Sequence, residues 1–271
     1  MKPIVQRLSF DFCKEHNSQP SPRNEYKPSP GDFFLPAIAE FVGTFIFTFL
    51  SIFSYLHTIN TQLVVSLVDG AILYALMCSL GCFSGAYFNP AQTLAVIFVG
   101  KCRLAVGFFM IFMQFLGAFF GAVYAQWILQ NHAFAVAMHA AMQWSSTTNI
   151  YAASGLQYFF MELTLSTLIC CAYLFTGVIS RGKNGTLCAS VVAITRGIIT
   201  LIAYSTIGQT ANLARTIGLS STTYIFLSIH YEWRFIYIPF LVDLISAPIA
   251  AIIYWLSVKY LMENIKSMPK D

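Results

Sequence analysis

The sequence predicts an all-α membrane protein with six transmembrane helices and two re-entrant half-helices, arranged as an inverted repeat. Three observations lead to this fold class. The 271 residues are 57% hydrophobic and only 10% charged, whereas an ordinary soluble domain is about 25% charged. Six segments are apolar over the roughly 20 residues that a helix needs to cross a hydrocarbon layer. Two short motifs centred on Asn89 and Asn212 share one pattern and lie 123 residues apart.

The six apolar segments are the predicted crossings, and each is long enough to span a bilayer as a helix. A soluble chain of this length has no means of hiding so much apolar surface. The crossings are predicted at residues 33–55, 63–82, 104–128, 155–178, 188–207 and 235–258.

The two halves of the chain repeat each other. Glu40 lies inside the first crossing and Glu162 inside the fourth, 122 residues apart, and each is followed about 50 residues later by its Asn motif. Each half contains three crossings, an odd number, so the second half must enter the membrane from the opposite face. Inverted repeats of this kind place a site near the bilayer midplane, at the interface between the repeats.

Residues 83–102 are too few for a spanning helix with its loops, and they are too apolar for a loop in water. We therefore expect a re-entrant loop that returns as a short helix. Proline is favoured as the first helical residue, so this helix should begin at Pro90, and Gly100 can end it. Residues 208–221 repeat the device from the other face, so the two half-helices are predicted to meet at mid-membrane.

The amides of Asn89 and Asn212 are then expected to converge on the two helix N-termini, each of which carries about half a positive charge. Such a site donates hydrogen bonds to the oxygen of a neutral molecule. It also repels cations, and it orients water so that a proton wire is interrupted.

These residues resemble the aquaporin (major intrinsic protein) family over about residues 36–258. The similar stretches are "AEFVGTF", "SGAYFNPAQT", "MQFLGAFFGA", "MELTLST" and "ANLAR". The resemblance implies the aquaporin fold, assembly as a homotetramer with one pore per subunit, and a channel that is not an enzyme and uses no cofactor or metal.

The resemblance also implies roles for individual residues. The midplane pore motifs would be Asn89, Pro90 and Ala91 in the first half and Asn212, Leu213 and Ala214 in the second. The selectivity constriction would comprise Asp69, Thr200, Gln209 and Arg215, and the carboxylates bracing the re-entrant loops would be Glu40 and Glu162.

The sequence departs from the family pattern at three places. Leu213 replaces the second proline, which leaves the half-helix intact because leucine is a good helix former. Asp69 and Thr200 stand where water channels usually have an aromatic residue and a histidine. Asp243 replaces a small residue of the sixth crossing.

The departures allow two arrangements for each acidic residue. Asp69 is expected to pair with Arg215, the alternative being a helix turned so that Asp69 faces the outer vestibule. For Asp243 the two possibilities are a pair with Arg196 and exposure in the vestibule.

The distribution of basic residues predicts the orientation. Twelve of the 15 Lys and Arg residues lie before the first crossing, after the second or fourth, or at the C-terminus, and the connections 56–62 and 129–154 contain none. By the positive-inside bias both termini are cytosolic. The net charge of +4 reflects this asymmetry and does not indicate nucleic-acid binding. We expect a disordered cytosolic tail (1–32), a channel domain (33–258, with repeats at about 33–128 and 155–258) and a cytosolic C-terminal tail (259–271).

The function predicted from these features is a passive water channel in the lipid bilayer of the plasma membrane.

 It is predicted to exclude protons and ions, and its partners are water, small neutral solutes and lipid. The nearest alternative is a pore that also or mainly passes ammonia, glycerol or urea. A non-conducting structural or junctional protein is an alternative from another class. An intramembrane enzyme or proton-coupled transporter is disfavoured, because the sequence has no H-E-x-x-H and no G-x-S-x-G motif.

Overall fold

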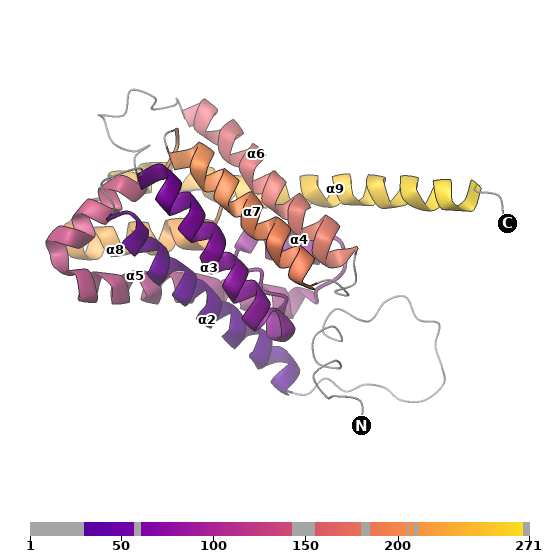
Figure 1. Ribbon diagram of the computed structural model, residues 1–271, viewed down its shortest axis with the longest axis horizontal. Helices are drawn as coiled ribbons and strands as arrows, with labels where there is room; N and C mark the ends of the chain where they lie inside the picture. Colours follow the sequence, from indigo (N-terminus) through magenta and orange to yellow (C-terminus); the bar gives the residue numbers. More distant parts are fainter. Residues whose placement is uncertain are drawn as a thin grey trace.

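The computed structural model describes residues 30–56, 61–142, 155–179, 185–204, 206–208 and 211–267, and the regular elements in this part of the chain are helices. The expected tail before residue 30 and the constriction residue Gln209 lie outside the described residues. Figure 1 shows long helices packed side by side along one direction, with α2 beginning and α9 ending toward the same end of the bundle.

Six long apolar helices in the described residues are each able to cross a membrane by length and composition, which confirms the predicted number of crossings. Two shorter helices, α4 and α8, follow the two Asn motifs. The long helices are α2 (Pro30–Ser54), α3 (Thr61–Ser84), α5 (Leu104–Ala141), α6 (Gly155–Tyr173), α7 (Gly185–Tyr204) and α9 (Tyr237–Ser267). The remaining elements are α4 (Pro90–Phe98), α8 (Leu213–Leu227), the π-helical turn η2 (Leu174–Val178) that continues α6, and the 3₁₀ turn η3 (Tyr231–Phe235) before α9.

The contacts between helices follow the inverted repeat. In the first half α2 packs against α5 and α3, and in the second half the corresponding α6 packs against α9 and α7. Each short helix packs against the last long helix of the other half, α4 against α9 and α8 against α5, and α3 meets α7 between the halves. The two short helices are therefore held inside the bundle by both repeats.

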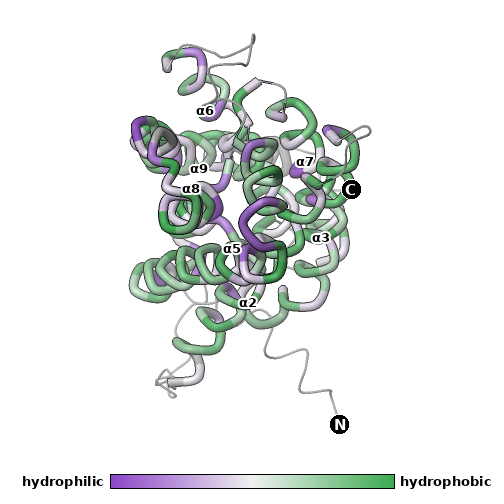
Figure 2. The backbone as a smooth tube through the Cα atoms, turned by 90° about the vertical axis from the view of Figure 1, so that its left-hand side faces the viewer, coloured by the Kyte–Doolittle hydropathy of each residue, from purple (hydrophilic) through white to green (hydrophobic). Residues whose placement is uncertain are grey.

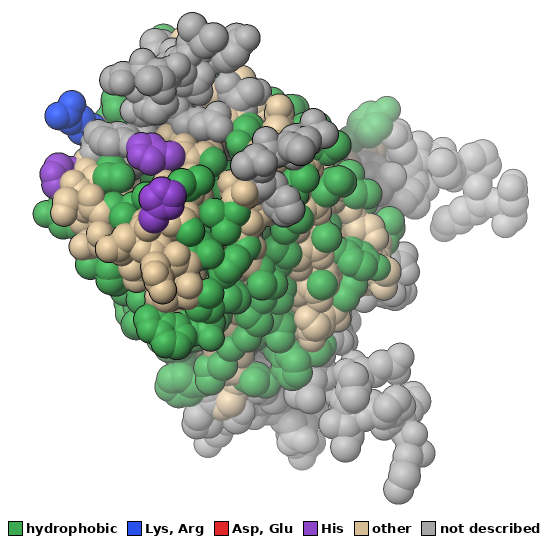
Figure 3. All heavy atoms as spheres, turned by 60° about the vertical axis from the view of Figure 1, so that its left-hand side comes forward, with side chains coloured by type: hydrophobic (Ala, Val, Ile, Leu, Met, Phe, Trp, Pro, Cys, Tyr) green, Lys and Arg blue, Asp and Glu red, His purple; other side chains and the backbone are tan. Residues whose placement is uncertain are grey.

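Polar residues are gathered inside the bundle, and apolar ones face outward. Figure 2 shows hydrophobic residues along the outer helices and hydrophilic segments toward the middle, between α8 and α3. Figure 3 shows a face that is largely hydrophobic along its length, with histidine side chains gathered at one end. Large apolar side chains such as Trp127, 71% exposed, and Leu67, 64% exposed, lie on the outside of the molecule. An apolar exterior around a polar interior is the arrangement that a bilayer requires, because lipid cannot solvate polar groups.

The third crossing is longer than predicted. Residues 131–141, expected to lie in a connection, form a second helical piece of α5 beyond a sharp bend at Gln130, whose φ is 58° and ψ is 175°. Phe134, Ala137 and Met138 are buried in this piece and pack with Ile52 and other residues at the ends of α2 and α8. Their spacing is that of one helix face, which explains why the segment folds back as a helix.

Two further boundaries differ from the prediction. The second re-entrant helix, expected to end near residue 221, runs to Leu227, where Ser228 ends it with a left-handed φ of 56°. Helix α9 continues to Ser267, past the boundary predicted at residue 258. Helix ends depend on local caps and packing that an apolar window does not report.

Close packing of α2 against α5 depends on two glycines. A Cβ atom at Gly117 would lie 2.4 Å from the Phe41 carbonyl oxygen, and one at Gly121 would lie 2.5 Å from that of Phe45. These residues are the G-x-x-x-G of α5, a pattern that lets helix backbones approach closely in membranes.

We predict that Gly121→Ala forces α2 and α5 apart, because the added methyl group meets backbone. Overpacking of this kind costs about 1–3 kcal/mol of unfolding free energy. The measurement is the thermal unfolding midpoint of the purified protein in detergent. Gly185→Ala is the control, since nothing lies within 4 Å of a Cβ at that position. Equal midpoints for the two variants would contradict the prediction.

Candidate functional site

Each short helix begins at an asparagine that caps it. Asn89, with a φ of −155°, precedes α4, and its Oδ1 accepts a hydrogen bond from the Ala91 N–H at 3.0 Å. Asn212, with a φ of −160°, precedes α8, and its Oδ1 accepts from the Arg215 N–H at 3.3 Å. Extended backbone and a side-chain acceptor are the usual features of an N-cap. Pro90 occupies the first helical position of α4, where the sequence predicts the helix to begin.

The two caps also bind each other's loops. Asn89 Nδ2 donates to the Ala211 carbonyl oxygen at 2.6 Å, and Asn212 Nδ2 donates to the Phe88 carbonyl oxygen at 2.8 Å. We call this reciprocal pair of hydrogen bonds the asparagine clasp. A side-chain amide carries two N–H donors, and the clasp uses one from each. The clasp leaves the second N–H of each amide for another acceptor.

The backbone before the two asparagines is strained in the same way in both repeats. Gly85 and Gly208 have φ values of 91° and 78°, and Phe88 and Ala211 have φ values of 47° and 55°. The shared Gly–x–x–x–Asn frame predicts a turn at each glycine. It does not reveal that the residue just before each asparagine has left-handed backbone, a conformation that is unusual for residues other than glycine. Such strain persists only where the surroundings hold it, and it clusters at functional sites.

Glu40 holds the first loop from inside α2. Its Oε1 accepts from Ser84 Oγ at 2.6 Å and from the Tyr87 N–H at 3.0 Å, and its Oε2 accepts from the Phe88 N–H at 2.6 Å. Gln114 Nε2 of α5 donates to the same Oε2 at 2.7 Å. The carboxyl is fully buried, and these donors replace the water that it would otherwise need.

Glu162 occupies the corresponding place on α6. Its Oε1 accepts from the Ala211 N–H at 2.8 Å, next to the carbonyl group that receives the clasp bond from Asn89. The two carboxylates therefore hold equivalent loops. Ser84 and Gln114 belong to the first repeat alone, and the repeat pattern in the sequence does not reveal them.

A second polar cluster lies around Asp69 of α3, which is fully buried. Asp69 Oδ2 lies 3.0 Å from Arg215 Nη1 and 3.0 Å from Arg196 Nη2, and it accepts from Thr200 Oγ1 at 3.1 Å. Its Oδ1 accepts from Ser51 Oγ at 2.6 Å. We call these five residues the Asp69 cluster.

The Asp69 cluster contains the expected contact between Asp69 and Arg215, and Thr200 lies beside it. Arg215 Nη2 also donates to Ser51 Oγ, and its guanidinium lies over the Phe47 ring, 4.5 Å from the centroid. Sequence reasoning missed Ser51 and Phe47, which are ordinary residues of an apolar helix until the fold brings them to the arginine.

Both expectations for Asp243 are wrong. Arg196 pairs with Asp69 instead, and Asp243 is 2% exposed, so it neither meets Arg196 nor faces a vestibule. The register of α7 against α3 explains the difference, because it places Arg196 and Thr200, one helical turn apart, on the face toward Asp69. With two guanidinium groups and one carboxylate, the Asp69 cluster carries a formal charge of +1.

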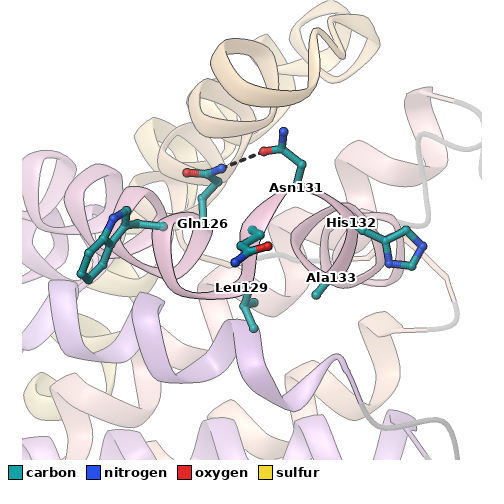
Figure 4. A pocket seen from close by; sticks show the side chains of 7 residues that line it. Gln126, Leu129, Asn131, His132 and Ala133 are labelled. Carbon is teal, nitrogen blue, oxygen red and sulfur yellow. Dashed lines mark hydrogen bonds between the residues drawn. The ribbon is translucent and has the colours of Figure 1, made fainter.

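A separate hollow lies at the bend of α5, away from both clusters. Its volume is about 580 Å³, and Gln126 Nε2 donates to Asn131 Oδ1 at 2.9 Å across it (Figure 4). The hollow is open and lined by one stretch of chain, so it offers little enclosure to a ligand. The described residues contain no group of three or more His, Cys, Asp or Glu that could hold a metal ion. The lining residues are Gln126, Trp127, Leu129, Gln130, Asn131, His132 and Ala133.

The chain is similar to known channels along most of its length. The Major intrinsic protein family profile matches residues 30–254. Aquaporin PIP1-2 of Musa acuminata is 30% identical over 115 residues, which cover 38% of this chain and 45% of that protein. Aquaporin-5 of Mus musculus is 34% identical over 104 residues, covering 37% and 39%. These alignments thus span less than half the length of the curated relatives.

The fold is similar to the X-ray structure of the aquaglyceroporin from Plasmodium falciparum. The TM-score is 0.65 with 23% sequence identity, and the match covers 82% of this chain and 95% of that one. Aquaporins of the matched family are channels and not enzymes. Together with the six apolar helices and the paired half-helices, the profile match over residues 30–254 shows that this integral membrane protein belongs to the major intrinsic protein family.

Proposed function

We propose that the protein is a passive water channel that excludes protons and ions. The observation that carries the proposal is the asparagine clasp, in which one N–H of each amide binds the opposite loop and the other is left for a permeating molecule. The two helix N-termini beside the amides make the same place positive. A neutral molecule with an accepting oxygen is stabilised there, whereas a cation is repelled.

The Asp69 cluster is proposed as the selectivity constriction. Of the constriction residues predicted from the sequence, Arg215, Asp69 and Thr200 lie in this cluster. These side chains are 1%, 0% and 6% exposed. Such low exposure shows that the cluster leaves no wide opening, which argues against passage of a bulkier solute such as glycerol. Asp69 also holds the Arg215 guanidinium toward α3. If the arginine thereby leaves room for urea or ammonia, the pore passes small neutral solutes. Such a solute-passing pore is the second candidate function.

The remaining parts of the proposal concern the assembly and its membrane. We place both termini on the cytosolic side of the plasma membrane, supported by the distribution of basic residues. A homotetramer is supported by family membership. Most large exposed side chains are apolar, which suits both lipid and a neighbouring subunit.

The experiment that tests the function is osmotic shrinkage of proteoliposomes followed by stopped-flow light scattering. Water flux above that of bare lipid, without re-swelling in glycerol, urea or an ammonium gradient, supports the water channel. Re-swelling supports the broader pore. Flux equal to that of bare lipid overturns both and supports a non-conducting structural protein.

Replacing either clasp residue should slow water. We predict that Asn212→Ala lowers water permeability about fivefold, since one lost hydrogen bond of about 1 kcal/mol raises a barrier by that factor. The measurement is the shrinkage rate per reconstituted protein. Thr164→Ala, at an exposed position on α6, is the control and should keep the wild-type rate. An unchanged rate in Asn212→Ala would place the water pathway elsewhere.

Removing the constriction arginine should admit larger solutes. In Arg215→Ala the carboxylate of Asp69 keeps Arg196 as its partner, so the buried charges stay balanced. We predict a rise of about tenfold in glycerol permeability, equivalent to a barrier lower by about 1.4 kcal/mol. Re-swelling of proteoliposomes in glycerol measures it, with water flux recorded on the same sample. Glycerol entry that stays at the wild-type level would show that Arg215 does not line the constriction.

Loss of Asp69 should damage the fold more than loss of Arg196. Asp69→Ala leaves two buried guanidinium groups without their carboxylate, and breaking a buried pair costs about 3–5 kcal/mol. Arg196→Gln leaves Asp69 with Arg215, Ser51 and Thr200 and should cost less. Thermal unfolding in detergent compares the two variants. A midpoint for Asp69→Ala at or above that of Arg196→Gln would contradict the prediction.

A further inference from the structure

Arg196 of α7 is a buried cation that takes no part in the asparagine clasp. The residue is 2% exposed. Its Nη2 donates to Asp69 Oδ2 at 3.0 Å, and its Nε donates to the same oxygen at 3.3 Å. Its guanidinium also lies over the Phe47 ring, 5.6 Å from the centroid. Burying a charge is costly even when the charge is paired, so a second arginine beside one carboxylate requires an explanation.

The packing of α3 against α7 fixes Arg196 in this place. Asp69 and Arg196 are each followed by a glycine at which the two helices approach closely. A Cβ atom at Gly70 would lie 3.0 Å from the Ala193 carbonyl oxygen, and one at Gly197 would lie 3.1 Å from a carbonyl oxygen of α3. Small residues permit such close backbone contact between membrane helices. The sequence neighbours of the pair therefore hold the carboxylate and the guanidinium together.

Asp69 is shared between two arginines. Its Oδ2 lies 3.0 Å from Arg215 Nη1 and 3.0 Å from Arg196 Nη2, and it also accepts from Thr200 Oγ1 at 3.1 Å. Hydrogen bonds and positive charges of this kind favour the ionised carboxylate. A pair of Asp69 and Arg215 alone would have a formal charge of zero. Arg196 therefore supplies the positive charge by which the cluster exceeds neutrality.

The excess charge matters because the cluster is buried. Asp69, Arg196 and Arg215 are shielded from solvent, so water screens their charges poorly. Arg215 Nε has no hydrogen-bond partner within the described part of the chain. Such a donor can bind a neutral molecule with an accepting oxygen, while the unbalanced positive charge repels a cation.

We propose that Arg196 is a specificity-determining residue of the Asp69 cluster: it shares the Asp69 carboxylate with Arg215 and so keeps the cluster positive toward permeating cations. Without Arg196, the negative charge of Asp69 would cancel that of Arg215 and lower the barrier to a cation such as K⁺. Water carries no net charge, so its flux depends little on Arg196. The inference rests on the proposed channel function and adds Arg196 to the constriction.

Three variants and a control separate the effect of charge from that of packing. Arg196→Gln lowers the formal charge of the cluster from +1 to zero, and Arg196→Lys keeps it at +1. The double variant Asp69→Asn, Arg196→Gln removes one charge of each sign and returns the cluster to +1. Replacing both partners of a buried pair is tolerated better than removing one. Arg103→Gln, at an exposed position before α5, is the control.

Each variant is reconstituted as the full chain in vesicles of neutral lipid that contain a potassium-sensitive dye. A proton ionophore balances the charge that K⁺ carries, and osmotic shrinkage is measured on the same vesicles. We expect Arg196→Gln to raise K⁺ entry about tenfold, because one buried charge is removed from the path. Water permeability should stay near the wild-type value. K⁺ entry should remain at the wild-type level in Arg196→Lys, in the double variant and in Arg103→Gln.

Two results would overturn the proposal and leave the channel function intact. One is unchanged K⁺ entry in Arg196→Gln although wild-type water flux exceeds that of bare lipid. The other is K⁺ entry raised equally in Arg196→Gln and in the double variant, which would indicate a leak through damaged packing. Wild-type water flux equal to that of bare lipid would overturn the channel function, and the proposal with it.

Discussion

The asparagine clasp is the interaction on which the rest of the structure depends. Two stretches of non-helical backbone reach the middle of the bundle, where lipid supplies no hydrogen bonds, so their polar groups must be satisfied by protein. The clasp joins the two loops through the carbonyl groups of Phe88 and Ala211. Left-handed backbone at these same two residues turns their carbonyl groups toward the opposite loop. The strain is tolerated because it completes the hydrogen bonds.

Buried carboxylates support this centre from two helices. Glu40 on α2 and Glu162 on α6 accept from loop N–H groups. A third carboxylate, Asp69 on α3, neutralises one of the two arginines that it contacts. A carboxylate in a membrane is expensive when it is unpaired, so each of these three identifies a backbone turn or an arginine that requires it.

The two clusters divide the proposed work of the channel. In the proposed channel the clasp would present donors and positive dipoles to whatever passes the centre, and the Asp69 cluster would narrow the path. Arg215 links the two, because its backbone N–H is bonded by the Asn212 cap while its guanidinium meets Asp69 and Ser51. The side chain of Arg215 therefore belongs to the Asp69 cluster, and its backbone belongs to the cap of α8.

The fold class could be predicted from the sequence, because apolar length and the odd number of crossings per repeat leave few arrangements in a bilayer. The sequence also located the half-helix starts at Pro90 and after Asn212, since proline and asparagine have strong positional preferences at helix N-termini. The partner of Arg196 depends on the tertiary structure, because a buried charge takes whichever partner the helix register brings within reach. The same holds for Phe47 and for residues 131–141, whose contacts with distant helices no local pattern encodes.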